Sequence, residues 1–188
     1  MTAAARSRNP KGKRLRRLDL AEKHCVNFQI KQSTKNLSVL MNTNEKNVKI
    51  KIFAIVMRGE EDDVEKDNIR ITCDGVMRYD GERVEIAYEE VMGEEGVAFN
   101  TLSFLSAEPD VVTLAREGAV SCVMTFSENC RYRGAYDMGF LSFDFTVATK
   151  RVENHISFEK GGVLVLDYNT EMQGVSMQNS RFRFTITT

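Results

Sequence analysis

The sequence predicts an all-β protein, an antiparallel up-and-down β-barrel of roughly eight to ten strands that follows a disordered, basic N-terminal extension. Three observations favour this fold. After residue 46, apolar and polar side chains alternate in short runs, which is the period of half-buried strands. Turn-forming residues separate these runs at close spacing, and no run has a convincing helical period. The alternation also continues into the first and last runs, as expected if these two strands pair and close the barrel.

The first 46 residues differ from the rest in charge. Through Asn47 the chain has 11 Lys and Arg against 3 Asp and Glu, a net charge of +8, whereas the remainder has a net charge of −9. The segment lacks hydrophobic periodicity and is rich in Asn, Ser, Thr, Lys and Gln, which is the composition of a disordered chain. We therefore expect a disordered basic extension over residues 1–46 and one barrel domain over residues 47–188.

The cations at residues 6–17 give the extension one weak functional indication. They are one signal for contact with nucleic acid, although no aromatic side chains lie between them to stack on bases. A solvated tail is the simpler explanation of a bare run of charge. We also expect a chain that begins at Met41 to keep the barrel, because removing a disordered segment sacrifices no buried apolar area.

The first half of the barrel is predicted as six strands. Residues 48–56 form the first, and residues 69–73 and 76–79 form two more, separated by an Asp74-Gly75 turn. Asp80-Gly81 is a two-residue hairpin signal, and a strand over residues 84–88 follows it. Residues 97–105 and 111–116 are the next two strands, and Glu108-Pro109-Asp110 turns the chain between them.

The second half begins with residues 119–126, where Val120, Cys122, Met124 and Phe126 share one parity. Residues 127–130 form a turn, and pairing of Phe126 with Arg131 would place Cys122 opposite Ala135. Further strands follow at residues 132–136, 140–149, 164–168 and in a last run through residue 186, with an irregular connection over residues 151–158. A barrel is the neatest closure of this meander, and a two-sheet sandwich is the alternative.

The bulk composition describes an ordinary soluble domain. The chain has 188 residues, of which 42% are hydrophobic, enough for one core, and its net charge is −1. Its four cysteines form no CxxC or Cys/His cluster, so we expect free thiols, no metal site and a cytoplasmic location. No apolar run is long enough to cross a membrane as a helix, and the basic start is not followed by the apolar core of a secretory signal.

The order of several motifs resembles that of one known family. The motifs are Tyr88-Glu89-Glu90, Thr101, the Arg-Glu-Gly-Ala-Val run at residues 116–120 with Met124 and Phe126, Tyr136, Gly139, Thr149-Lys150, Gly162, Tyr168 and the region of Asn179. Over about residues 48–188 the chain is similar to the YwiB-like bacterial family, a domain of unknown function. The resemblance implies a calycin-like (lipocalin-like) β-barrel and brings no assigned activity, catalytic residue or cofactor. The family usually has Ser where this chain has Glu117, and its members usually begin just ahead of the first strand.

The candidate chemistry points to binding and not to catalysis. Glu89 and Glu90 are adjacent on a strand and so face opposite sides, which excludes them as an acid/base pair and favours a surface or rim position. His24 and His155 have no nucleophile motif or second metal ligand nearby, so we expect no catalytic residue and no metal. Arg116 could face an anionic ligand inside the barrel or pair with an acidic neighbour.

We therefore expect the barrel to hold a small anionic or amphipathic ligand. The candidate binding residues are Arg116, Tyr88, Thr101, Ser121, Thr125 and Tyr136. The lumen would be partly polar if Ser121 and Thr125 point inward, and apolar and filled if Cys122, Met124 and Phe126 do. The alternation does not show which of the two faces points inward. The alternative is an adaptor protein whose barrel is filled by side chains and contacts a macromolecule. The sequence predicts no oligomeric state.

Overall fold

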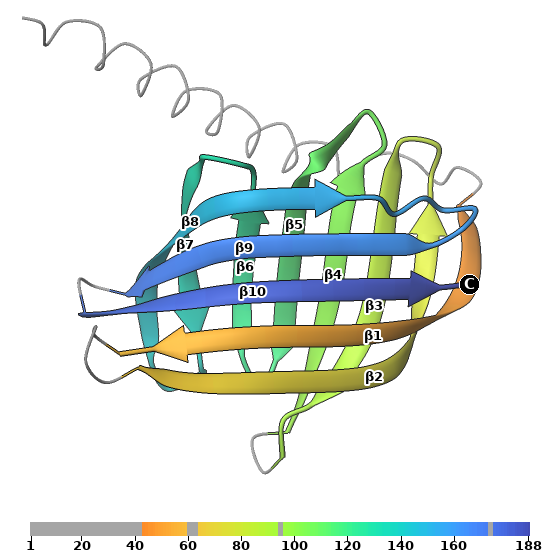
Figure 1. Cartoon of the computed structure of the whole chain (residues 1–188). Helices are drawn as coiled ribbons and strands as arrows, with labels where there is room; N and C mark the ends of the chain where they lie inside the picture. The colour runs from red at the N-terminus through yellow and green to blue at the C-terminus, as the bar shows by residue number, and fades with distance from the viewer. Residues whose placement is uncertain (1–42, 60–63, 94–95, 173–174) are drawn as a thin grey trace, which may run out of the picture. The chain divides into compact units, whose positions relative to one another are not determined.

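The chain folds into ten antiparallel strands that close into a barrel, which confirms the predicted fold class (Figure 1). The computed structural model describes residues 43–59, 64–93, 96–172 and 175–188. The strands are β1 (Asn44–Arg58), β2 (Glu65–Tyr79), β3 (Arg83–Val91), β4 (Val97–Leu105), β5 (Glu108–Gly118), β6 (Ser121–Phe126), β7 (Arg131–Asp137), β8 (Ser142–Asn154), β9 (Gly162–Met172) and β10 (Val175–Thr187).

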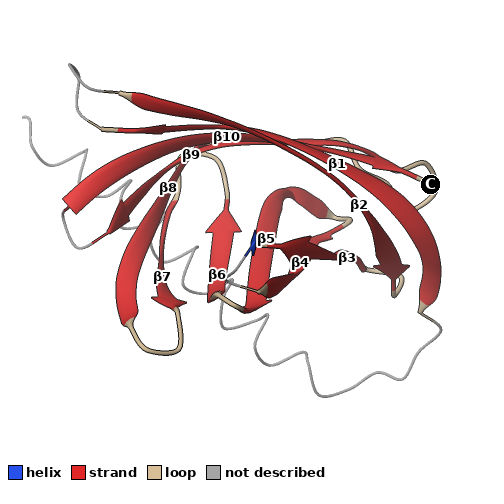
Figure 2. Cartoon of the chain, turned by 90° about the horizontal axis from the view of Figure 1, so that it is seen from below, coloured by secondary structure: helices blue, strands red, loops and turns tan. Residues whose placement is uncertain are grey.

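The closure follows the predicted pairing of the first and last strands. Neighbours around the barrel are in the order β1-β10-β9-β8-β7-β6-β5-β4-β3-β2, and Ile52 of β1 lies opposite Phe184 of β10. Strands β8 to β10, β1 and β2 run across the direction of β3 to β7 in Figure 1, and Figure 2 shows β1 and β10 on one side of the barrel with β3 to β6 on the other. A continuous ring of paired strands excludes the two-sheet sandwich.

The barrel begins earlier than the sequence predicts. Strand β1 starts at Asn44, and Lys46 lies opposite Met77 of β2, so residues 44–46 belong to the barrel and not to the extension. These residues are polar and carry no periodic pattern, but backbone pairing with β2 extends the strand through them. The rest of the predicted extension, residues 1–42, and the prediction for a chain that starts at Met41 lie outside the described residues.

Two local predictions were wrong for backbone reasons. Asp74-Gly75 is not a turn, because β2 runs through it; a side chain at Gly75 would place its Cβ 2.6 Å from the carbonyl oxygen of Ala87, so the glycine permits close approach of β3. Cys122 lies opposite Tyr136 instead of Ala135, and the turn between β6 and β7 includes Asn129 with a positive φ of 60°. The predicted cross-strand neighbour of Cys122 was therefore wrong by one residue.

Strand β8 is longer than predicted. It continues through Asn154 past an irregularity between Thr149 and Arg151, so part of the expected irregular connection is strand. Bulges of this kind bend a strand and increase its twist, which a barrel needs at its corners.

Three seams in the barrel wall are shorter than the rest, and one of them joins β5 to β6 between residues 112–116 and 122–126. Strands β2 and β3 pair only between residues 75–79 and 84–88, and β6 and β7 pair only at Ser121–Asp137 and Cys122–Tyr136. By contrast, β1 and β2 pair along their whole length, from Asn44 opposite Tyr79 to Arg58 opposite Glu65. The half of β2 that lies ahead of Gly75 therefore has β1 as its only paired neighbour.

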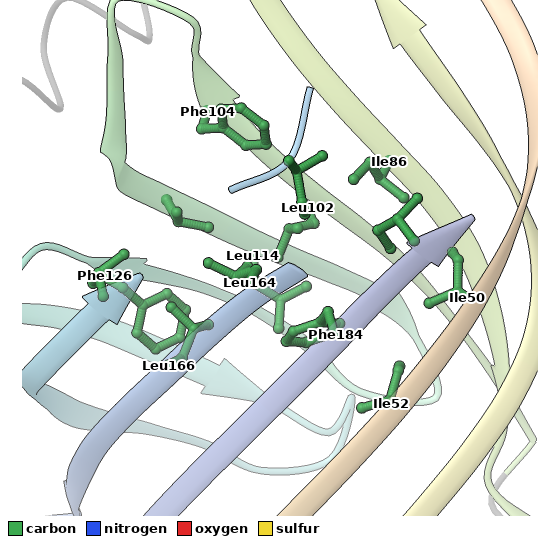
Figure 3. Close-up of a cluster of buried hydrophobic side chains, with 14 of the residues drawn as sticks. Ile50, Ile52, Ile86, Leu102, Phe104, Leu114, Phe126, Leu164, Leu166 and Phe184 are labelled. Carbon is green, nitrogen blue, oxygen red and sulfur yellow. The ribbon is translucent and has the colours of Figure 1, made fainter. Parts of the chain in front are cut away.

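Inside the barrel, one end is packed with apolar side chains. We call it the packed half; it lies toward the turns that join β2 to β3, β4 to β5, β6 to β7 and β8 to β9. Figure 3 shows buried apolar side chains of the interior, those of this end together with residues such as Leu114 and Phe184 that lie toward the other end. The buried members of the packed half include Ile50, Met77, Ile86, Leu102, Phe104, Val112, Leu164 and Ile186. We call the opposite end of the interior, where β3, β5 and β7 end, the open half.

The structure also decides which face of β6 points inward. Cys122 and Phe126 are buried in the core cluster and Met124 packs against it, so the apolar parity is inside. Cys73 and Cys122 are free thiols, and no helix among the described residues is long and apolar enough to span a membrane.

Candidate functional site

The open half of the barrel contains a cavity of about 350 Å³. Most of its wall is apolar; one group of polar side chains comes from β3, β4 and β5, and Arg58 of β1, Thr170 of β9 and Gln178 of β10 add others. The apolar part includes Ile71, Leu114, Met124, Phe126, Phe145, Leu166, Phe182 and Phe184; the polar part includes Glu90, Asn100, Arg116 and Thr170. Binding pockets for small molecules typically have volumes of roughly 300–1,000 Å³ and combine apolar walls with a few placed polar groups.

Arg116 is the centre of the polar wall. It lies near the end of β5 with Asn100 of β4 directly opposite, and its Nε donates a hydrogen bond to Asn100 Oδ1 at 3.0 Å. Its Nη2 donates to Glu90 Oε2 of β3 and forms an ion pair with that carboxylate. The side chains of Arg116 and Glu90 are 20% and 22% exposed, so solvent only partly screens the pair.

Glu90, Asn100 and Arg116 each continue a row of inward-facing side chains that is otherwise apolar. On β3 the inward row is Val84, Ile86 and Tyr88, followed by Glu90. On β5 it is Val112 and Leu114, followed by Arg116. Period-two alternation carries each row from the core to the site, and the pairing of β3, β4 and β5 brings the three rows side by side.

Two buried tyrosines lie next to this polar wall. Burial raises the pKa of Tyr88, and the negative charge of Glu90 raises it further while Arg116 opposes the shift. Burial raises the pKa of Tyr168 to about 12, against a smaller lowering by a hydrogen bond with Ser180. Both phenols are therefore neutral near pH 7 and retain a hydroxyl that can donate.

The thiol of Cys122 lies on the same inward face but is not an activated nucleophile. Burial raises its pKa, and Arg116 only partly opposes that shift. The thiolate is the form that attacks, so a raised pKa makes this cysteine less nucleophilic than an exposed one. Among the described residues there is also no group of three or more His, Cys, Asp or Glu side chains placed to hold a metal ion.

Half of the predicted site residues line the cavity. Arg116, Tyr88 and Tyr136 contribute to its wall. Thr101, Ser121 and Thr125 have the opposite parity on β4 and β6 from the cavity-lining Asn100 and Met124, and they do not line it. The sequence left two roles open for Arg116, and the structure shows the pairing with an acidic neighbour.

Sequence reasoning missed Glu90, Asn100 and Tyr168. Glu90 was assigned to the surface or rim, although the expectation that Glu89 and Glu90 face opposite sides agrees with the exposed Glu89. The missed signal was the parity of β3, since a residue two positions after an inward Tyr88 also points inward.

Comparisons with known proteins agree with this barrel. The family described as "Domain of unknown function (DUF1934)" matches residues 50–184. The crystal structure of the ywiB protein from Bacillus subtilis is similar over 77% of this chain and 94% of that one, with a TM-score of 0.57 and 17% sequence identity. At that identity the likeness concerns the fold alone. No curated protein has significant sequence similarity to the chain.

Proposed function

Because the chain belongs to the DUF1934 family, whose description assigns no activity, we propose a function from the site itself: the barrel binds a small amphipathic molecule in the cavity of its open half. The observation that carries this proposal is the contrast within one cavity between largely apolar walls and a hydrogen-bonded polar cluster of Arg116, Glu90 and Asn100. An apolar body would lie against Leu114, Met124 and the phenylalanines, and a polar head would face the cluster.

The ion pair restricts the charge of the head group. Arg116 and Glu90 neutralise each other, and an additional anion beside Arg116 would also lie close to the Glu90 carboxylate. At a separation of 4 Å two like charges repel by about 4 kcal/mol at an effective dielectric constant of about 20. A neutral head with a hydroxyl or amide therefore fits the resting site best, and an anionic head requires the carboxylate to move away or become protonated.

The cavity favours ligand binding over the alternative of a side-chain-filled adaptor. A filled barrel would leave no room in the lumen, and this description fits only the packed half. We also propose a cytoplasmic location, which the free thiols of Cys73 and Cys122 support.

Isothermal titration calorimetry with three probes of one chain length tests the proposal. Octanol, octanoate and octylamine differ only in the head group, so their order of affinity reports the chemistry of the polar wall. We expect octanol to bind more tightly than octanoate to the wild-type chain. Failure of all three to bind would contradict a lumen site for amphipathic molecules.

Two isosteric variants provide the matched control. Glu90→Gln frees Arg116 from its carboxylate, so octanoate should bind at least about tenfold more tightly, a change of about 1.4 kcal/mol. Glu89→Gln removes the same charge from the adjacent, outward-facing position and should leave the affinity unchanged. Equal effects of the two substitutions would show that the head group does not lie near Arg116.

A further inference from the structure

The outer surface of β1, β2, β8 and β10 carries a concentration of positive charge. We call it the basic face, and it consists of Lys51, Lys66, Arg70, Lys150, Arg181 and Arg183, all of them exposed. From residue 43 onward the chain has 16 Lys and Arg against 25 Asp and Glu, so more than a third of its cations lie on this face of an acidic domain. Such segregation produces a local positive potential that the net charge conceals.

Strand pairing arranges these cations around apolar side chains of β1. Phe53 lies between Arg70 of β2 and Arg183 of β10, and the Arg70 guanidinium lies 5.6 Å from the centre of the Phe53 ring. A depression of about 310 Å³ is bordered by Lys51, Phe53, Arg70 and Arg183. A second depression of about 390 Å³ is bordered by Ile55 and Met57 and by the other three cations.

Most of this charge is available for a partner. Arg181 forms an ion pair with Asp167 at 2.7 Å, but the other five cations have no ion-pair partner within the described parts of the chain. Cations elsewhere in the barrel, such as Lys49, Arg58 and Arg131, do have carboxylate partners. The basic face therefore has excess charge that an anionic partner would neutralise.

We propose that the basic face binds single-stranded nucleic acid. Arg181 and Arg183 repeat along β10 at about 6.7 Å, the two-residue spacing of a strand. Lys51 on β1 lies opposite Thr185, beyond one end of that row, and Lys66 on β2 lies level with Asn179, beyond the other. Phosphates would bind the cations, and bases would contact the half-buried Phe53, Ile55 and Met57 in the two depressions.

An anionic membrane is a poorer match. Charge alone attracts a basic surface to anionic lipid, and binding gains strength when apolar side chains project beyond the charged ones and insert between head groups. Here Phe53, Ile55 and Met57 are half-buried and lie between the longer cationic side chains, so charge would meet a partner first.

Fluorescence anisotropy with the full chain and a labelled single-stranded RNA of mixed sequence tests the proposal. The double variant Arg70→Gln, Arg183→Gln removes two cations from one depression, so binding should weaken at least about tenfold at low salt. The slope of the logarithm of affinity against the logarithm of salt should decrease in magnitude by about 1.4, since each lost contact with a single strand contributes about 0.7.

The control pair, Arg133→Gln with Lys160→Gln, removes two exposed cations that lie outside this face. This control should leave the affinity and the salt slope unchanged. The basic N-terminal residues are the same in the control and in the face variants, so they cannot cause a difference between them. A second pair, Lys66→Gln with Lys150→Gln, samples the other depression and should weaken binding as the first pair does. Thermal melts confirm that each variant is folded.

Three results would overturn the proposal. In the first, the two face variants bind as tightly as the wild-type chain, which would assign any RNA binding to other residues. In the second, the control pair weakens binding as much as the face pairs, which would mean that RNA is attracted by cations anywhere on the protein and not by the basic face. In the third, the chain binds phosphatidylserine vesicles but not RNA, which would assign the face to a membrane.

Discussion

Leu102 and Leu114 lie directly opposite each other on β4 and β5, at the level where the packed half meets the open half, and only Leu114 lines the cavity. Leu102 is 1% exposed within the packed half, whereas Leu114 is 8% exposed and forms part of the cavity wall. Two residues farther toward the open end, the same inward rows contain Asn100 and Arg116. The same strands therefore build both the apolar core and the candidate site. The change from core to site takes place over two residues, which is one repeat of the strand period.

The largest expected effect compares these two leucines. Leu102→Ala should lower the free energy of unfolding by about 3–5 kcal/mol, because it leaves a cavity among well-packed neighbours. Leu114→Ala should cost about 2 kcal/mol, because the existing cavity means that this side chain has fewer contacts to lose. Urea unfolding of both variants measures the difference. Equal losses would mean that the two halves are packed alike.

The dependence of stability on pH tests how closely Tyr168 is packed. Its ring contacts Phe126 at a centroid distance of 4.9 Å and stacks on Phe182 at 6.0 Å. Its pKa is raised to about 12 in the folded chain, while an unfolded tyrosine ionises near pH 10. The unfolded state therefore loses its proton first. Stability from this residue is full below about pH 10 and is lost between about pH 10 and 12, by about 3 kcal/mol in all.

The variant Tyr168→Phe isolates that contribution. It should unfold with a shallower loss of stability between pH 10 and 12 than the wild-type chain, measured by urea unfolding at each pH. If the two chains lose stability in parallel, Tyr168 does not stay protonated in the folded barrel.

Gly75→Ala tests the short seam between β2 and β3. The new methyl group would lie 2.6 Å from both the Ala87 carbonyl oxygen and Ile50 Cδ1, so the strands must move apart. Overpacking of this kind costs about 1–3 kcal/mol. Gly81, in the hairpin turn beside β3, has a positive φ of 97° but open space around it, so Gly81→Ala separates backbone strain from crowding. A melting temperature unchanged by Gly75→Ala would show that the seam is not closely packed.

The smallest expected effect concerns the rim of the packed half. Lys46 Nζ donates to the carbonyl oxygen of Glu159 at 3.1 Å and lies 4.6 Å from the centre of the Phe158 ring. Lys46→Ala should cost about 0.5–1 kcal/mol, the usual contribution of a cation over an exposed ring. Lys46→Arg should retain most of it. A loss equal to that of Leu102→Ala would mean that residues 44–46 are part of the core.

Much of the fold was predictable because strand period is a local property. The alternation in residues 48–56 and in the last strand was sufficient to predict the pairing that closes the barrel. The errors at Gly75 and Asn129 arose where backbone geometry, and not side-chain pattern, decides the path of the chain. A glycine that permits close strand approach has the same sequence signature as a glycine in a turn.

The site was only partly predictable. Arg116 was recognisable because a charged residue follows the apolar residues 111–115, and the same argument applied along β3 would have found Glu90. Their ion pair depends on the register among β3, β4 and β5, which brings together side chains 26 residues apart in the chain. Register results from the closure of the whole barrel, so the sequence pattern alone could not indicate which acidic residue meets Arg116.

The most direct test of the central claim, that ligand binding is confined to the open half, is methyl NMR during a titration with octanol. We expect the methyl resonances of Leu114, Met124 and Ile71, which line the cavity, to shift. The resonances of Ile86, Val112 and Leu102 in the packed half should stay unchanged. Shifts confined to the packed half or to the outer surface, or no shifts at saturating octanol, would contradict the claim.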